Sequence, residues 1–532
     1  MPDFLCDTLR NSLRTLRLKK IPVLKSFRMK KTQTILLLLL FIAAISTSKA
    51  QDLPFAKAEI TVSAEMKKSF QPGGRLLLHL TKQREKEPHL KSDITIAVTP
   101  ANWDLAIPFQ VDAQNKAVMI YNSEKVQSPP SQIYYYQAVY KQNQDDGQEN
   151  VPGNMISNVD SLLLSAHPQI HLTLDKIIPP NEIIDHKFVK SVVIQSKFLS
   201  EFSGRPRYLR ASVLLPSGYF KNPGKNYPIC YRAPGLNGRY TAVNGHMKDK
   251  EFTDWWFTDS APQVIYVYLD SQGPYGDTYQ VDSENNGPCG KALTEELIPA
   301  IEKLVHYNPA TKMRFLTGYS TGGWVSLGLQ VFYPDFFDGT WSYSPDPVDF
   351  SHYGLIDIYK DSTIFYNKYG YLQPGRRTIY DEPTFSMKEW IAGENLVSRT
   401  GDYRISGGQF GAYNAVFGPK GSDGLPSLMF DPVTGKIDHA IASKWEKYDL
   451  KKVLETNWTK LGPKLQGKIW IWTGDADGLY SNVATRFLKM YLDGTQNPKS
   501  DAKISFTPLA GHCQEWSDKA LLKMIAEKAT GK

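Results

Sequence analysis

The sequence predicts an all-β domain over residues 51–180 and an α/β domain with a mostly parallel sheet over residues 181–532. The first part carries short runs of alternating apolar and polar residues, as half-buried strands do. The second alternates strand-like and helix-like patterns, which is typical of βαβ units. A serine between glycines, Ser320, follows a strand-like run and opens a helical one. At 532 residues the chain is also longer than a usual single domain.

Residues 1–50 have the pattern of an export signal. A basic stretch beginning at Met29 precedes an apolar run over residues 35–45, and small residues end at Ala50. We therefore expect cleavage after Ala50 and a secreted or periplasmic protein with no stable membrane span. An uncleaved anchor is the alternative. The stretch before Met29 has no domain pattern, and we interpret it as an upstream start artefact.

The net charge of +8 is confined to the predicted signal. Residues 1–50 hold ten Lys/Arg and two Asp/Glu, which is the whole excess. The rest of the chain is neutral, so we expect no nucleic-acid partner. C-x-x-C and H-E-x-x-H spacings are absent from the sequence, and we predict neither a metal nor a cofactor.

Residues 51–180 predict a sandwich of immunoglobulin-like type. The aromatic run at residues 134–136 has two interpretations: it binds sugar rings, or half of it points into a core because side chains alternate along a strand. A proline pair at residues 179–180 marks the linker. The clearest strand-like runs are residues 75–80, 93–98 and 132–137.

The α/β domain is predicted from buried strand patterns and helical spacing. Strands are expected at residues 209–216, 227–231, 264–270, 315–317, 468–472 and 503–507. Helices are expected at residues 293–305, 324–332 and 483–492. Pro299 should bend the first of these helices.

Ser320 is the candidate nucleophile. It stands in G-Y-S-T-G-G at residues 318–323, between a strand and a helix. That setting turns a G-x-S-x-G serine into a nucleophile, because the flanking glycines permit a sharp turn and close packing. The motif alone is a weak signal, because a chain of this length holds roughly 0.2 such matches by chance, so partner residues have to support it.

A serine nucleophile needs a base and an acid. His512 follows the strand at residues 503–507 and a turn, so it is the candidate base. Asp475 and Asp477 follow the preceding strand, and both are candidates for the acid. Asp346 and Asp349, which follow the strand after the serine helix, are remoter candidates. The chain order Ser, Asp, His is the order that α/β-hydrolases use.

These motifs resemble an esterase family. The similarity rests on residues 208–219, the Pro-Gly loop after Tyr231, E-L-I-P at residues 296–299, the Ser320 motif, and D-G-T-W-S-Y-S at residues 338–344. The family includes feruloyl and other carbohydrate esterases, S-formylglutathione hydrolases and siderophore esterases. The resemblance covers about residues 185–345 and 465–530. It implies an α/β-hydrolase fold with a long cap insertion at about 345–466.

The resemblance also implies roles for single residues. The family's Gly-x-x-Asp spacing matches Asp477, which leaves Asp475 as a turn residue. Two N–H groups must stabilise the oxyanion, and Thr321 and Leu236 are the candidates. The family commonly has His-Gly where this chain has Pro234-Gly235. The loop that would supply the second N–H, from Leu236, therefore departs from the family's pattern. We also expect Gly235 and Tyr319 to line the site. Apart from the resemblance, Asn285 and Asn286 follow another strand-like run, and they either line the site as well or form an ordinary Asn/Gly turn.

Cys289 and Cys513 raise the question of a disulfide. Export would permit one, and Cys513 follows the candidate base directly. Some relatives place a disulfide beside the catalytic His, but there the partner precedes the nucleophile, where this chain has Tyr319. Two separate thiols are the other interpretation. Cys230 lies in an apolar strand, where we expect a buried thiol.

The predicted function is an exported serine hydrolase that cleaves a carboxylic ester, on a carbohydrate or a related natural product, through an acyl-enzyme. A small-molecule or glycan-linked ester would be its substrate. The same residues would also serve a peptidase or an acyltransferase. A carbohydrate-binding surface protein that lacks activity is the alternative from another class. For the insertion, the alternatives are a cap over the substrate and a surface excursion that never meets it.

Overall fold

The computed structural model describes residues 55–112, 115, 117–122, 132–163, 168–180 and 182–531. Asp52–Lys532 form one compact unit. The predicted signal and its cleavage site lie outside the described residues. Within the described ranges, no helix has the length and apolar character to cross a membrane. The same residues contain no group of His, Cys, Asp and Glu side chains that could hold a metal ion.

The N-terminal part is all β. Among the described residues of this part, nine strands are hydrogen-bonded in the order β4-β1-β9-β7-β6-β2-β3-β5, with β8 paired to β6. Alternate residues from strands along the whole of this order share one apolar core, so the sheet folds over on itself. The immunoglobulin-like type stays a prediction. The strands are β1 (Lys57–Val62), β2 (Arg75–Thr81), β3 (Ile94–Val98), β4 (Phe109–Asp112), β5 (Met119–Asn122), β6 (Ile133–Lys141), β7 (Met155–Ser157), β8 (Asp160–Leu163) and β9 (Gln169–Ile177).

The aromatic run in β6 belongs to this core. Tyr134 and Tyr136 are buried, and both lie in the apolar cluster that the strands enclose. Tyr135 points to the other face and is half-buried. This alternation favours the core interpretation over a surface for sugar rings.

The α/β part is built on an eight-stranded sheet of order β10-β11-β13-β12-β18-β19-β22-β23. Only the β10–β11 and β11–β13 pairs are antiparallel, so the prediction of a mostly parallel sheet is confirmed. The strands are β10 (Val189–Ser196), β11 (Arg207–Leu214), β12 (Ile229–Arg232), β13 (Ile265–Leu269), β18 (Arg314–Tyr319), β19 (Gly339–Tyr343), β22 (Ile469–Gly474) and β23 (Lys503–Thr507).

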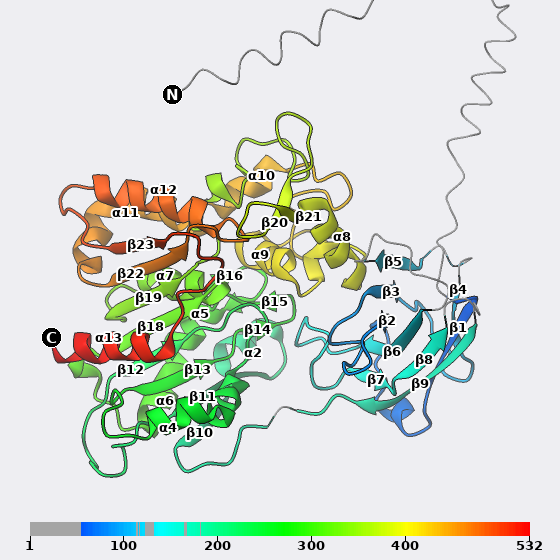
Figure 1. The fold of residues 1–532 in the computed structure, drawn as a ribbon, viewed down its shortest axis with the longest axis horizontal. Helices are drawn as coiled ribbons and strands as arrows, with labels where there is room; N and C mark the ends of the chain where they lie inside the picture. The colour runs from blue at the N-terminus through cyan, green and yellow to red at the C-terminus, as the bar shows by residue number, and fades with distance from the viewer. Residues whose placement is uncertain are drawn as a thin grey trace, which may run out of the picture. The chain divides into compact units, whose positions relative to one another are not determined.

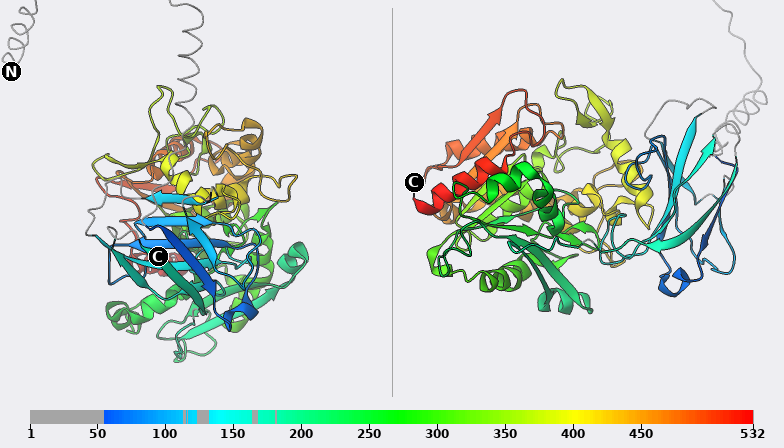
Figure 2. Two further views of the ribbon diagram at one scale, coloured as in Figure 1. Left: turned by 90° about the vertical axis from the view of Figure 1, so that its right-hand side faces the viewer. Right: turned by 60° about the horizontal axis from the view of Figure 1, so that its bottom comes forward.

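Helices cover both faces of this sheet (Figure 1, Figure 2). One apolar cluster includes residues of α6 (Ile298–Leu304), α7 (Thr321–Phe332) and α12 (Ser481–Gly494). A second cluster, from the opposite face, includes residues of α4 (Lys250–Trp256) and α13 (Asp518–Thr530). The other helices here are α2 (Lys197–Ser203), α3 (Val243–Lys248) and α5 (Cys289–Ala292).

The helix predicted at residues 293–305 is interrupted. A π-helical segment, Leu293–Leu297, joins α5 to α6, and Pro299 lies in the first turn of α6. Proline has no N–H to donate and its ring crowds the preceding turn. The predicted bend is therefore present as a wider turn just before Pro299.

The segment between β19 and β22 is a folded insertion. A hairpin of β20 (Pro374–Arg377) and β21 (Pro383–Ser386) precedes α8 (Met387–Val397), α9 (Gln409–Phe417) and α10 (His439–Ala442). The last helix, α11 (Leu450–Leu465), packs with α7 and α12 on the sheet. Its buried residues recur at helical spacing, so α11 is part of the sheet's helical layer, and the predicted cap boundary at 466 includes it.

Candidate active site

Ser320 occupies a strained turn between β18 and α7. Its backbone has φ 56° and ψ −126°, a conformation that residues with a Cβ rarely adopt. A Cβ added at Gly318 would overlap the carbonyl of Gly322, and one added at Gly322 would overlap the carbonyl of Ala233. The glycines of the motif are therefore required for strand, helix and neighbouring loop to approach closely. Ser320 itself is half-buried.

His512 is paired with Asp477. The Nδ1 atom of His512 lies 2.8 Å from Oδ2 of Asp477, a carboxylate with no solvent exposure. The backbone N–H of Leu479 donates to the other oxygen at 2.8 Å. Asp475 instead forms a surface ion pair with Arg486. The structure thus places Asp477, and not Asp475, against the candidate base.

The charged form of His512 is favoured by its surroundings. Burial alone would lower its pKa, but the hydrogen bond to Asp477 and the charge interactions with Asp477 and Cys513 raise the pKa well above its ordinary value. Its Nε2 atom is buried and has no partner among the described residues. The structure shows no hydrogen bond from Ser320 to this atom within the described part of the chain. Such bonds are often long in ligand-free enzymes.

Backbone contacts hold the His512 loop against the Asp477 turn. The N–H of Cys513 donates to Ser344 Oγ at 3.1 Å. A Cβ on Gly474 would overlap the carbonyls of Ala510 and Gly511, so the two loops meet backbone to backbone. The acid Asp477 follows β22 and the base His512 follows β23. Both lie at the carboxyl edge of the sheet, where ligands of such folds bind.

Two backbone donors are free near Ser320. Among the described residues, the N–H groups of Thr321 and Leu236 have no hydrogen-bond acceptor. Thr321 is the first residue of α7, where N–H groups lack partners within the helix. Leu236 lies in the loop after β12. Gly235 brings this loop close to Tyr319, because a Cβ there would be 2.8 Å from the Tyr319 ring.

A buried carboxylate lies behind Thr321. Oδ2 of Asp346 accepts hydrogen bonds from Thr321 Oγ1 at 2.8 Å, Tyr279 Oη at 2.6 Å and Gln409 Nε2 at 3.1 Å. Burial raises the pKa of Asp346 in spite of these donors. Asp346 does not hydrogen-bond to His512, and Asp349 accepts from His352 Nδ1 at 2.9 Å. Neither remoter acid candidate is paired with the base.

Sequence reasoning missed this cluster because its members come from four separate segments. Tyr279 precedes a short hairpin, and Gln409 begins α9 of the insertion. The only local signal was the carboxylate at position 346, one residue beyond the proline that follows β19.

The remaining predicted site residues, Tyr319, Asn285 and Asn286, contact other parts of the chain. The Tyr319 ring packs edge-on against Trp516, with ring centroids 4.9 Å apart. The amide of Asn285 donates to the carbonyls of Ala415 and Gly418, both at 3.0 Å, and so fixes the end of α9. Asn285 and Asn286 line a cavity of about 360 Å³ whose walls include none of Ser320, Asp477 and His512.

The three cysteines of the described chain are all free thiols. Cys230 is fully buried in β12, as predicted. Cys289 is also buried, donates to the carbonyl of Asn286 at 3.4 Å, and has its pKa raised to about 12 by burial. Cys513 is half-buried beside His512. The structure therefore agrees with separate thiols and not with a bridge.

Comparison with known proteins identifies the family. The Esterase family, described as "Putative esterase", matches residues 205–505. No curated protein matches the sequence. Similar solved structures include a ferulic acid esterase (14% identity, TM-score 0.41, covering 64% of this chain and 97% of that one). An S-formylglutathione hydrolase from Agrobacterium tumefaciens has 13% sequence identity and a TM-score of 0.36, and the match covers 65% of this chain and 98% of that one. A ferulic acid esterase from Anaeromyces mucronatus has 14% sequence identity and a TM-score of 0.31, and the match covers 64% of this chain and 89% of that one. Since the family match spans more than half of the sequence, the chain belongs to the Esterase family and its α/β domain has the α/β-hydrolase fold.

Proposed function

We propose that the chain is an exported serine hydrolase that cleaves a carboxylic ester, carried by a carbohydrate or a related natural product, through an acyl-enzyme. Ser320 is the nucleophile, His512 the general base and Asp477 the residue that orients the imidazole. The N–H groups of Thr321 and Leu236 stabilise the oxyanion. Family membership supports the ester chemistry.

The first half of the reaction acylates the enzyme. Ser320 Oγ attacks the ester carbonyl carbon while His512 Nε2 takes the hydroxyl proton. Negative charge develops on the carbonyl oxygen and is stabilised by the two N–H donors. The intermediate collapses, the bond to the alcohol breaks, and the alcohol leaves with the proton from Nε2. Asp477 stabilises the imidazolium throughout this step.

The second half releases the acid. Water attacks the acyl carbon, and its proton passes to His512 Nε2. The bond to Ser320 breaks, the serine regains a proton from the imidazolium, and the carboxylic acid departs. Each half consumes and returns one proton at the same nitrogen. No group besides the substrate and water is required.

The observation that carries the proposal is the state of the His512 ring. Its Nδ1 is held by a fully buried carboxylate at 2.8 Å, and its Nε2 is buried with no partner among the described residues. An unpartnered buried nitrogen costs about 1–3 kcal/mol. A transferable proton at that position is therefore the chemistry that this arrangement favours, and it lies at the same sheet edge as the strained Ser320.

Covalent labelling with a fluorophosphonate tests the nucleophile. Wild type should label at Ser320, Ser320→Ala should not label, and Ser260→Ala, which changes an exposed serine, should label like wild type. Labelling of the Ser320→Ala protein at wild-type level would refute the assignment. A panel of esters and matched amides then separates the candidates: ester turnover supports the proposal, and preferential amide cleavage identifies a peptidase.

Export has its own test. The predicted signal ends at Ala50, so protein recovered from its native compartment should begin at Gln51. Mature protein that begins near Met29 would contradict cleavage and favour the anchor.

A further inference from the structure

The polar cavity that Asn285 and Asn286 line has none of Ser320, Asp477 and His512 in its walls. Its volume is about 360 Å³, which is large enough for a small organic ligand. Its walls come from α2, β11, the loops that follow β13, α5 with the π-helical segment after it, the insertion, and Gln144 of the N-terminal part. These loops include two short hairpins, β14 (Gln272–Gly273) with β15 (Gly276–Asp277) and β16 (Asp282–Ser283) with β17 (Gly287–Pro288).

The lining of this cavity has an excess of positive charge. Among the described residues that line it, Asp270 is the only carboxylate, and five side chains are cationic: Arg205, Arg207, Arg210, Arg399 and Lys420. Arg205 and Arg207 share one partner, Asp145, at 2.8 and 3.1 Å. These ion pairs therefore leave part of the positive charge uncompensated.

Two guanidinium groups have no carboxylate of their own. Within the described residues, neither Arg210 nor Arg399 forms an ion pair or donates a hydrogen bond from its side chain. Arg210 stacks over the ring of Tyr208 and feels the charge of Asp270, but Asp270 is already paired with Arg239 at 3.2 Å. Burial lowers the pKa of Arg399, and no carboxylate counteracts it.

The cavity also contains buried amides without partners. Both side-chain polar atoms of Asn286 and both of Gln272 are buried and unpaired within the described part of the chain. Gln280 leaves its Oε1 atom unpaired in the same way. Asn286 is only 8% exposed. Buried amide groups in native proteins are nearly always satisfied, so this cluster requires polar partners inside the cavity, which either water or the polar groups of a ligand can supply.

We propose that this cavity binds an anionic molecule that carries hydroxyl groups, such as a sugar acid or a sugar phosphate. Arg210 and Arg399 bind its carboxylate or phosphate, because a guanidinium forms paired, charge-assisted hydrogen bonds with either group. Asn286 and Gln272 bind its hydroxyl groups, since a hydroxyl donates to an amide oxygen and accepts from an amide nitrogen.

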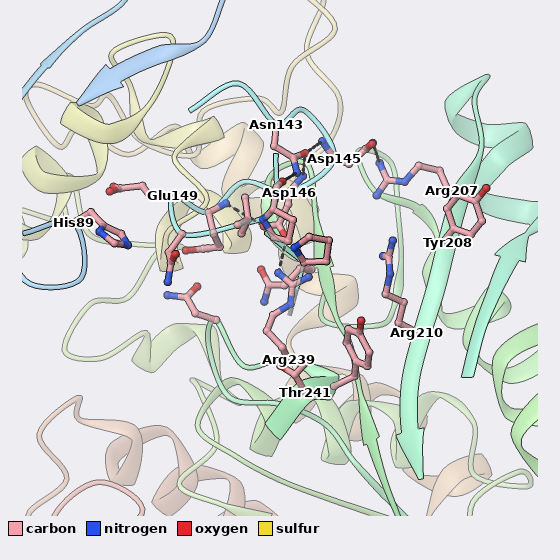
Figure 3. A pocket seen from close by; sticks show the side chains of 18 of the residues that line it. His89, Asn143, Asp145, Asp146, Glu149, Arg207, Tyr208, Arg210, Arg239 and Thr241 are labelled. Atoms are coloured by element: carbon pink, nitrogen blue, oxygen red, sulfur yellow. Dashed lines mark hydrogen bonds and ion pairs between the residues drawn. The ribbon is translucent and has the colours of Figure 1, made fainter. Parts of the chain in front are cut away.

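A larger cavity shares a wall with this one. It has a volume of about 660 Å³ and is lined in part by Arg207, Tyr208, Arg210 and Gln272, which line the smaller cavity as well. Figure 3 shows the guanidinium groups of Arg207 and Arg210 turned toward the same space, with an ion pair drawn for Arg207 only. Arg210 is thus accessible from two sides.

The shared wall lies at the same sheet edge as Ser320. The larger cavity is also lined by Asn237 and Arg239, which follow the candidate oxyanion donor Leu236 in the same loop. In the sheet, β11 is three positions from β18, a separation of roughly 14 Å at the usual strand spacing. A ligand bound at Arg210 would therefore lie within reach of the active site without occupying it.

Calorimetric binding to the Ser320→Ala protein tests the proposal independently of any hydrolysis. The probes are D-glucuronate, glucose 6-phosphate and glucose. At least one of the two anions should bind saturably, and glucose should bind about tenfold more weakly or not at all. The stronger anion identifies the carboxylate or the phosphate as the preferred group. Raised salt should weaken binding, because the attraction is electrostatic.

Variants locate the site. Arg210→Gln and Arg399→Gln should each weaken binding of the preferred anion about tenfold. Asn286→Ala should weaken both the anion and glucose. Lys221→Gln, an exposed lysine paired with Asp259 outside the cavity, should change nothing. Equal binding of glucose and the anions, no saturable anion binding, or anion binding that survives both arginine substitutions would overturn the proposal.

Discussion

Replacing Asp477 with Asn tests the pairing on which the proposed chemistry depends. The Asp477 carboxylate accepts two hydrogen bonds of 2.8 Å, from Leu479 N and from His512 Nδ1. An Asn side chain has one acceptor oxygen and one donor nitrogen. If the oxygen keeps the bond from Leu479, the amide nitrogen faces Nδ1 and excludes a proton there.

The neutral ring then carries its proton on Nε2, the nitrogen that has to accept the proton of Ser320. We therefore expect kcat/KM for an ester to fall by roughly 10⁴-fold, the cost of the wrong tautomer in a comparable triad. Thermal unfolding should be monitored in parallel, because Asp477 is fully buried. A folded but inactive protein is the expected outcome.

The pH dependence supplies a second measurement. The pKa of His512 is raised above its ordinary value, so in wild type the neutral, basic form increases only as pH rises through that higher pKa. The acid limb of activity should accordingly lie above the usual range of histidine. Removing the Asp477 charge removes the largest influence that raises the pKa and leaves burial, which lowers it, opposed only by Cys513. The acid limb of the pH–activity profile, measured on the residual activity of Asp477→Asn, should therefore move to lower pH.

Asp475→Asn is the matched control. Asp475 is half-exposed and pairs with Arg486 at the surface, an interaction worth at most about 1 kcal/mol. Its activity and pH profile should stay close to wild type when kcat/KM is measured with a chromogenic ester. A larger loss in Asp475→Asn than in Asp477→Asn, or an acid limb that does not move in the latter, would refute the reasoning.

Three further predictions follow from the turn, the glycines and the thiols. Ser320→Gly should be more stable than Ser320→Ala by about 1 kcal/mol in urea unfolding, because only glycine adopts φ 56° without strain; equal midpoints would contradict a strained turn. Gly322→Ala should lose stability and turnover through overlap with Ala233, whereas Gly245→Ala, with no atom within 4 Å in α3, should keep both. Iodoacetamide should modify Cys513 without prior reduction and faster than the buried Cys289; a 289–513 disulfide peptide in the mass spectrum would contradict the free thiols.

The parts of the fold that were predicted are those with strong local patterns. The strand β13 is an unbroken apolar run. The turn from β18 to α7 is marked in the sequence by the glycines that flank Ser320. Between Asp475 and Asp477, the resemblance to the esterase family favoured Asp477 through its Gly-x-x-Asp spacing, and Asp477 is the residue that contacts His512. In each case the deciding information lies within a few neighbouring residues.

The parts that were not predicted depend on contacts between distant segments. The assignment of α11 to the sheet layer requires knowing where the insertion ends in space, since an amphipathic helix looks the same in a cap. The bonds of Asn285 to α9 join residues 130 and 133 positions apart. Local periodicity contains no information about such partners.

The contacts of Asp346 connect the insertion to the candidate oxyanion donor. A buried carboxylate is tolerated only when donors surround it, and one of its three donors, Gln409, comes from α9 of the insertion. Another donor is the side chain of Thr321, whose backbone N–H is the proposed oxyanion contact. A shift of α9 would therefore leave Asp346 short of a donor and change the position of Thr321. By this argument the insertion acts on the active site through packing and hydrogen bonding, whether or not it contacts the substrate.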